Sequence, residues 1–411
     1  MNKFSKWIRK TYSKITGSIA FYPAIIAIGF LILSWLMLEL DYSDVGKHFK
    51  ANFNWIKLKD ATTARSIIST IIGGIISLTV FSFSMVMILL NQAASQMSNR
   101  MLSSMIGNRF QQLTLGFYIG TIVYALFSLS SIRDIDSGIY VPALSIYLLL
   151  LLTITDIFLF IYFLHYVTQS VKYETIISRV HRTTMDALQL IWNSDQPQLY
   201  TPPEIKGQSI SMVSSGYYQG FNEIELINFA AEKKGAVHFL HPAGEYLLKG
   251  SPLLIFYSDQ QLTEKDEKLL LMPIDFYKGQ PLEINPYYGY HQLAEVAIKA
   301  LSPGINDPET AVLSIHALTD LFLHRLNHYS QTVFKDKNNV TRVVTIEWTF
   351  EELFEECYGP IWDYGMNDLY IQNALTRMLE QLKMADVQGN HHAVFNIFIN
   401  KIKAHKAEIY L

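Results

Sequence analysis

The sequence is poor in cysteine and in charge. Cys357 is the only cysteine in 411 residues, so no disulfide can form within the chain and no cysteine cluster can hold zinc or an iron–sulfur centre. Charged residues make up 17% of the chain, and their formal sum is -3 at pH 7. Nucleic-acid-binding surfaces are basic, and no basic block offsets this balance, so we expect no nucleic-acid partner.

The short motifs of common catalytic and cofactor sites are also missing. The sequence contains no Walker-type loop, GxGxxG pattern or GxSxG pattern. His324 and His328 have helical i, i+4 spacing, but no Glu lies between them as in HExxH, and we expect both to face solvent. His391 and His392 are adjacent and therefore point in different directions. These absences disfavour an enzyme, and we expect no metal site and no cofactor.

The apolar and charged residues divide the chain in two. Half of the residues are hydrophobic, but long apolar runs dominate residues 20–168, whereas residues 170–411 carry most of the charge. The sequence therefore predicts a membrane α-helical domain at residues 20–168, followed by a soluble cytoplasmic α+β domain.

Four segments are apolar enough and long enough to cross a bilayer, whose hydrocarbon core is ~30 Å thick. These predicted transmembrane helices cover residues 20–40, 67–90, 113–131 and 140–167. Residues 1–19 form a basic segment, but the apolar run that follows is too long for a typical signal peptide and lacks a small-residue cleavage site. We interpret that run as an uncleaved first transmembrane helix.

Basic residues near the spans predict the orientation of the chain. Five basic residues precede the first span, two basic residues and no acid separate the second span from the third, and Lys172, Arg179 and Arg182 follow the fourth. The loop between the third and fourth spans is net acidic. Residues 41–65 carry five basic residues, but acids dilute them. We predict a multi-pass protein whose N- and C-termini are both cytoplasmic.

The second span carries a regular stripe of small and polar residues, which we call the seam. Thr70, Ser77, Ser84 and Asn91 are spaced by seven residues, and Gly73 fills the offset of three. A stripe that repeats every ~3.5 residues keeps facing one partner when helices supercoil left-handedly. Two interpretations are open, because small residues let membrane helices pack closely, whereas hydroxyls and amides can also line an aqueous ion path.

The fourth span contains a carboxyl group, that of Asp156. A carboxylate at this depth in a bilayer costs at least ~2.5 kcal/mol. No Lys, Arg or His lies at a comparable depth in the other predicted spans. Asp156 is therefore either protonated and hydrogen-bonded to a neighbouring helix, or it takes part in the passage of a cation or proton.

The second half of the chain is predicted to mix strands and helices. The fourth span is expected to run on as a connecting helix over residues 169–195, in one continuous rod that ends at the proline-rich residues 196–204. Within the predicted domain at residues 200–411, residues 207–258 form a small β-rich unit and residues 285–411 are mostly helical. The individual predicted strands cover residues 209–213, 236–240, 246–248, 253–257 and 341–348.

The segment 302–309 joins two predicted helices. Ser302 and Gly304 lie where the first helix ends, and Asp307 fits the N-cap of the second. One interpretation is a capped helical hairpin. The other is that these residues and Asn306, together with the amides at the helix start, form a site for a small ligand or ion.

Three stretches resemble one family. They are the segment at residues 81–129, which contains LLNQAASQMSNRMLSSMIGNRFQQLTLGFY, the pair SGYYQGFNEIELINFA and HPAGEYLLKGSPL at residues 215–230 and 241–253, and HQLAEVAIKALSPGINDPETA at residues 291–311. This pattern is similar to the bacterial predicted membrane proteins grouped as domain of unknown function 2254. The resemblance implies an integral protein of the bacterial plasma (inner) membrane with a cytoplasmic C-terminal domain, and it implies no particular reaction.

Three hypotheses for the function follow. In the first, the chain is an oligomeric channel or transport protein in the lipid bilayer, the seam faces an axis shared by a homo-oligomer, and the cytoplasmic domain regulates the passage of a small ion. In the second, it is a non-conducting membrane-anchored sensor or scaffold that binds a cytoplasmic ligand or protein. In the third, it is a membrane-anchored enzyme acting at residues 302–309.

Overall fold

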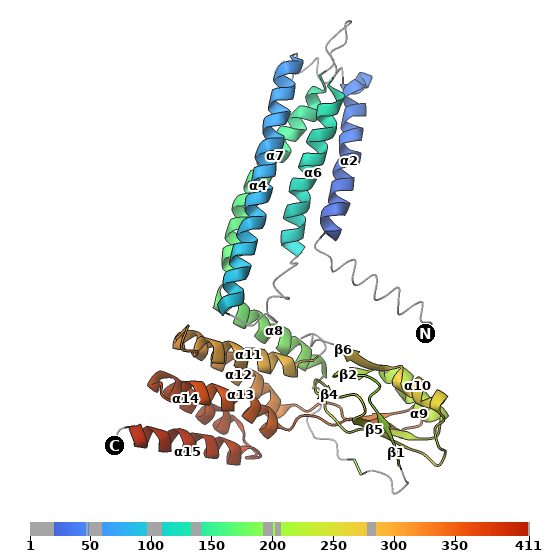
Figure 1. Cartoon of the computed structure of the whole chain (residues 1–411), viewed down its shortest axis with the longest axis vertical. Helices are drawn as coiled ribbons and strands as arrows, with labels where there is room; N and C mark the ends of the chain where they lie inside the picture. The colour runs from blue at the N-terminus through green and yellow to red at the C-terminus, as the bar shows by residue number, and fades with distance from the viewer. Residues whose placement is uncertain are drawn as a thin grey trace. The chain divides into compact units, whose positions relative to one another are not determined.

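The computed structural model describes residues 20–46, 48, 60–96, 109–132, 141–191, 200–201, 207–277 and 285–409 (Figure 1). The chain divides into two compact units, Met1–Lys172 and Tyr173–Leu411. We call them the membrane unit and the C-terminal unit. The basic segment at residues 1–19 lies outside the described residues.

Four helices of the membrane unit are long and apolar enough to cross a membrane, as the sequence predicts. They are α2 (Phe21–Tyr42), α4 (Ala61–Gln96), α6 (Arg109–Ser131) and α7 (Ala143–Ser170). Helix α4 begins earlier than the predicted span because the Asp60 carboxylate accepts hydrogen bonds from the backbone amides of Thr62 and Thr63, at 3.2 and 2.8 Å. This side chain satisfies amides of the first turn that have no partner within the helix.

Helix α2 packs closely against two glycines of α6. A Cβ atom on Gly116 would lie 2.6 Å from Ile26 Cδ1, and one on Gly120 would lie 2.7 Å from Phe30 Cγ. The Phe30 ring also meets the Phe117 ring edge-on, with 5.1 Å between the centroids. The spacing of the two glycines is the small-xxx-small pattern of closely packed membrane helices.

Asp41 ties the end of α2 to the start of α7. Its carboxylate accepts hydrogen bonds from the amides of Leu144 and Ser145, at 3.1 and 2.8 Å, and from the Ser145 hydroxyl at 2.7 Å. The Tyr124 hydroxyl of α6 donates to the Ser145 carbonyl at 3.1 Å. Asp41 is buried, so this cap joins three helices at one end of the unit.

The predicted continuous rod from the fourth span is interrupted. Helix α7 ends at Ser170, and α8 (Tyr173–Ile191) begins after Val171 and Lys172. The connecting helix is thus a separate element that belongs to the C-terminal unit. Its buried face packs against other helices of that unit, and Ile176, Val180 and Leu188 lie on it.

The C-terminal unit contains a five-stranded and a three-stranded sheet. The five-stranded sheet has the order β1-β5-β3-β8-β7, with β3 and β8 parallel and the other pairs antiparallel. Its strands are β1 (Gly207–Ser211), β3 (Ala236–Phe239), β5 (Pro252–Tyr257), β7 (Val333–Lys335) and β8 (Thr341–Val344). The three-stranded sheet consists of β4 (Tyr246–Leu247), β2 (Gly216–Phe221) and β6 (Ile274–Tyr277), in that order.

The sequence predicts a β-rich unit at residues 207–258. The two sheets also include strands from outside this range. Strands β7 and β8 come from beyond residue 330, and β8 pairs with β3 through Val343 beside Val237. The strand at residues 341–348 was predicted, but its pairing with β3 was not, because hydrophobic periodicity reports burial and not the pairing partner. Two capped helices, α9 (Glu223–Glu232) and α10 (Glu264–Leu271), cover the apolar core of this part.

Six helices make up the rest of the C-terminal unit. They are α8, α11 (Tyr287–Ala300), α12 (Pro308–Asn327), α13 (Phe350–Gly365), α14 (Leu369–Ala385) and α15 (His392–Ile409). The predicted apolar faces of α11 and α12 are buried, including Leu293 and Ile315. Helix α13 continues through Pro360, and Ile361 and Trp362 beyond it are also buried in the core.

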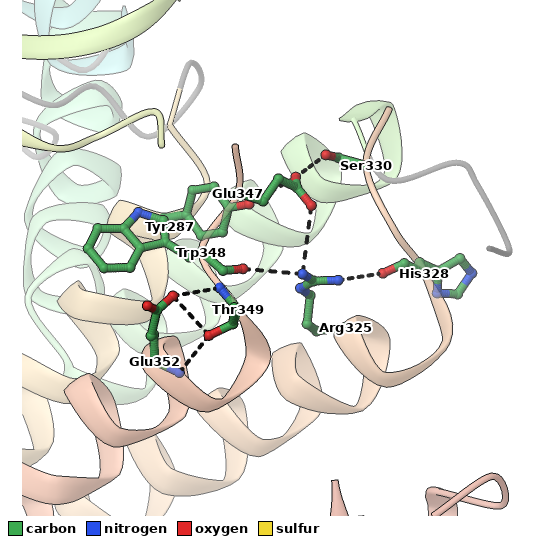
Figure 2. A network of polar contacts seen from close by, with 8 residues as sticks. All are labelled: Tyr287, Arg325, His328, Ser330, Glu347, Trp348, Thr349 and Glu352. Carbon is green, nitrogen blue, oxygen red and sulfur yellow. Dashed lines mark hydrogen bonds and ion pairs between the residues drawn. The ribbon is translucent and has the colours of Figure 1, made fainter. Parts of the chain in front are cut away.

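A buried ion pair connects the helices to the strands (Figure 2). Arg325 Nη2 lies 3.7 Å from the Glu347 carboxylate. Arg325 Nη1 donates to the His328 carbonyl at 3.1 Å, and Nη2 donates to the Trp348 carbonyl at 3.3 Å. Glu347 also accepts hydrogen bonds from the hydroxyls of Tyr287 and Ser330. The network therefore holds α11, α12 and the segment between β8 and α13 together.

Candidate functional site

The seam of α4 lies on the exposed surface of the membrane unit. Thr70, Gly73, Ser77, Ser84 and Asn91 are all exposed. The opposite face of α4 is buried against α6 and α7, and it carries Ala64, Ile68, Ile71 and Ile75. Among the described helices of this chain, none covers the seam. Packing within one protomer therefore does not explain it, and the packing interpretation requires a partner outside the chain.

Two of the seam hydroxyls are hydrogen-bonded to their own helix. The hydroxyl of Thr70 donates to the Ser66 carbonyl at 2.8 Å, and that of Ser77 donates to the Gly73 carbonyl at 2.9 Å. A Cβ on Gly73 would meet no atom within 4 Å. Because these two hydroxyls use their protons along the helix, their lone pairs remain available to a partner or an ion on the exposed side.

A second set of polar side chains lies inside the membrane unit, where helices α4, α6 and α7 meet. Asp156 of α7 is fully buried, and its carboxyl interacts with the Thr121 hydroxyl of α6. Tyr118, one turn away on α6, interacts with both Asp156 and the Ser82 hydroxyl of α4. Within the described residues, none of these side-chain oxygens has a hydrogen bond of good geometry. We call these four residues the buried polar cluster.

The cluster is part of a longer polar stripe along α6. Thr114, Tyr118, Thr121 and Ser128 recur at intervals of four, three and seven residues, and all are buried. At ~1.5 Å per residue, this stripe is roughly 21 Å long, which is most of the ~30 Å hydrocarbon thickness. The same heptad spacing that identifies the α4 seam could have identified this stripe in the sequence. Ser82 lies only two residues from Ser84 but belongs to the opposite face of α4.

The segment 302–309 forms a helix cap. The Asp307 carboxylate accepts hydrogen bonds from the Thr310 amide at 3.2 Å and the Thr310 hydroxyl at 2.6 Å. Asn306 has a left-handed backbone with φ of 49°, and its amide donates to the Ser302 carbonyl. Gly304 is exposed. The predicted cap at Asp307 is thus confirmed, and a ligand site at Ser302, Gly304, Asn306 and Asp307 stays a prediction.

The histidines of the C-terminal unit are held by ordinary structural contacts. His324 and His328 stack with 4.2 Å between ring centroids and are half-buried, so the prediction that both face solvent is wrong. His391 pairs with Glu351 at 2.6 Å, whereas His392 lies 3.0 Å from the Lys383 carbonyl. Among the described residues, no group of three or more His, Cys, Asp or Glu could hold a metal.

Cys357 is buried within α13. Burial raises the pKa of its thiol far above the usual range, because the thiolate would lose its hydration. The thiol is therefore kept in its unreactive form in the folded protein.

Comparison with known proteins agrees with the presence of long apolar helices that could cross a membrane. The profile of a family of predicted membrane proteins, DUF2254, matches residues 16–381. The chain belongs to the DUF2254 family. It is 28% identical over 262 residues to the uncharacterized protein MT1328 of Mycobacterium tuberculosis (strain CDC 1551 / Oshkosh) and 27% identical over 262 residues to the uncharacterized protein Mb1321c of Mycobacterium bovis. Each alignment covers 61% of this chain and 49% of the relative.

This DUF2254 chain thus spans about half the length of the mycobacterial relatives it matches. The comparison with solved structures finds no significant match. The comparisons place the chain among membrane proteins and leave its function to be inferred from its own side chains.

Proposed function

We propose that this DUF2254 protein is an oligomeric channel or transport-type protein of the bacterial plasma membrane, with the α4 seam facing an axis shared between copies. The observation that carries this proposal is the exposure of the seam. Its five polar or small residues lie on the outer face of α4, while the other face of that helix is buried in its own protomer. A second copy of the chain is the partner that we infer.

The chemistry of the seam supports a shared path better than simple contact with lipid. Lipid tails offer no hydrogen-bonding groups, so a lipid-facing stripe gains nothing from hydroxyls and an amide. Apolar side chains flank the seam on the same exposed surface, including Phe81, Phe83 and Ile88. In a ring of copies, these flanks would pack between subunits while the hydroxyls and Asn91 face the axis.

The C-terminal unit is the proposed regulator. Helix α8 follows α7 after only two residues, Val171 and Lys172. In this proposal, the short connection transmits a conformational change of the C-terminal unit to a membrane-spanning helix. We place this unit and both termini in the cytoplasm, on the strength of the basic residues beside the predicted spans.

Replacing Ser84 with leucine is expected to abolish ion flux while leaving the protein assembled. Leucine fills the path with apolar volume and removes a hydroxyl. Ser84 is exposed in its own protomer, so the substitution should not disturb the fold. K⁺ and Cl⁻ currents through the purified protein in planar bilayers measure the effect. Phe158→Leu, at an exposed position on α7 away from the seam, is the control and should keep wild-type currents.

Unchanged currents in Ser84→Leu would argue against the seam as the path. Absence of any current from the wild-type protein would remove the channel proposal and favour a membrane-anchored sensor or scaffold.

A further inference from the structure

The buried polar cluster inside the membrane unit holds more oxygens than its own hydrogen bonds satisfy. Ser82, Tyr118, Thr121 and Asp156 expose 5%, 1%, 0% and 0% of their surfaces. Within the described part of the chain, both carboxyl oxygens and all three hydroxyl oxygens lack a well-formed hydrogen bond. Buried polar groups are normally paired, so a convergence of unpaired oxygens from three helices points to a ligand that binds them together.

The charge of the cluster indicates that this ligand is a cation. An ionised carboxylate that is buried without a partner costs several kcal/mol. Arg65 lies in the first turns of α4, Arg109 begins α6, and His165 lies nine residues beyond Asp156 on α7. The Arg65 guanidinium donates to the Ile132 carbonyl. Among the described residues, no basic side chain is paired with the Asp156 carboxylate.

The donor set indicates a small monovalent metal ion. One carboxylate balances one positive charge, and carboxylate and hydroxyl oxygens are the ligands that hard cations prefer. A proton would also neutralise Asp156, but the hydrogen bonds that a protonated carboxyl and three hydroxyls could then form among themselves are not made within the described residues. These unpaired oxygens therefore favour a metal ion over a proton.

We propose that each protomer binds one Na⁺ at the buried polar cluster, with Asp156 supplying the charge and Ser82, Tyr118 and Thr121 supplying hydroxyl oxygens. The same buried face of α6 also carries Thr114 and Ser128. The site lies within a single protomer and on the opposite side of α4 from the seam. It therefore does not depend on the oligomer or on conduction along the seam.

The test measures Na⁺ binding by the purified full-length protein in detergent at pH 7.5. Replacing choline chloride with NaCl at constant ionic strength should raise the melting temperature of the wild type by about 3 °C or more. Titration calorimetry should give one Na⁺ per chain. Asp156→Asn should lose both signals, and Tyr118→Phe or Thr121→Val should weaken binding by roughly tenfold, the effect of one lost ligand. Asp44→Asn, an exposed acid near the end of α2, should bind Na⁺ as the wild type does.

Three results would overturn the proposal. One is a wild-type protein whose melting temperature is the same in choline and in Na⁺. Another is stabilisation by acidification to pH 5.5 without any response to Na⁺, which would assign the cluster to a proton. The third is an Asp156→Asn protein that keeps the Na⁺ response. If Asp156→Asn fails to fold, the Tyr118→Phe and Thr121→Val variants test the proposal instead. Wild-type Na⁺ affinity in both would show that the hydroxyls of Tyr118 and Thr121 are not ligands.

Discussion

Replacing Arg325 with methionine is expected to lower the free energy of unfolding of the C-terminal unit by about 3–5 kcal/mol. The Arg325 side chain is 7% exposed and that of Glu347 is 17% exposed, so the carboxylate would stay largely buried without its counter-charge. The substitution also removes the donors to the carbonyls of His328 and Trp348. Unpaired buried groups account for most of the cost of breaking such a pair.

The single cysteine makes this effect measurable in the full chain. Cys357 lies in the core of the same unit and is fully buried, so a thiol reagent reacts only after that unit opens. The urea midpoint of Cys357 labelling should fall by roughly 1–2 M in Arg325→Met. Arg377→Met, at an exposed position on α14, should leave the midpoint within error of the wild type.

A double variant separates the ion pair from the side chain's packing. Arg325→Met combined with Glu347→Gln removes the stranded charge and should recover a measurable part of the lost stability. A midpoint for Arg325→Met equal to that of the wild type would show that the network in Figure 2 is not what holds the helices and strands together.

Replacing Gly120 with leucine is expected to disrupt the membrane unit. The Cβ atom alone would lie 2.7 Å from Phe30 Cγ, and the rest of the leucine side chain has no space unless α2 moves away from α6. Overpacking of this kind costs at least about 1–3 kcal/mol. Size-exclusion chromatography of the detergent-solubilised protein after stepwise heating should show aggregation at a clearly lower temperature than the wild type.

Gly29→Leu provides the matched control. Gly29 lies on α2 itself, but a Cβ there would meet no atom within 4 Å, so this variant should retain the wild-type aggregation temperature. Equal behaviour of Gly120→Leu and Gly29→Leu would contradict the close packing of α2 on α6.

Sequence patterns predicted the structure correctly where it depends on residues that are close together in the chain. Asp307 caps a helix where the sequence predicts it, and Asn222 and Thr263 cap helices in the same way, because each side-chain oxygen can reach an amide three residues on. The four long apolar helices follow from the length and composition of their runs. The apolar faces of α11 and α12 follow from the 3.6-residue period.

Long-range contacts were not predictable in the same way. Nothing local in β8 indicates that it pairs in parallel with β3, since pairing is decided by the fold as a whole. Asp41 was expected in a polar loop, yet it caps α7 from the end of α2. The stripe of α6 has a regular spacing, but only the packing of α4 and α7 shows that it lies beside Asp156.

Cross-linking across the seam tests the central claim, that α4 faces a copy of itself, more directly than any other measurement. Cys357 is buried, so Ser84→Cys introduces an exposed thiol on the seam, while Ser82→Cys places one two residues away inside the protomer. Oxidation in proteoliposomes should convert Ser77→Cys and Ser84→Cys chains to covalent dimers on non-reducing gels and leave Ser82→Cys monomeric. Seam variants that stay monomeric under the same oxidation would contradict the account.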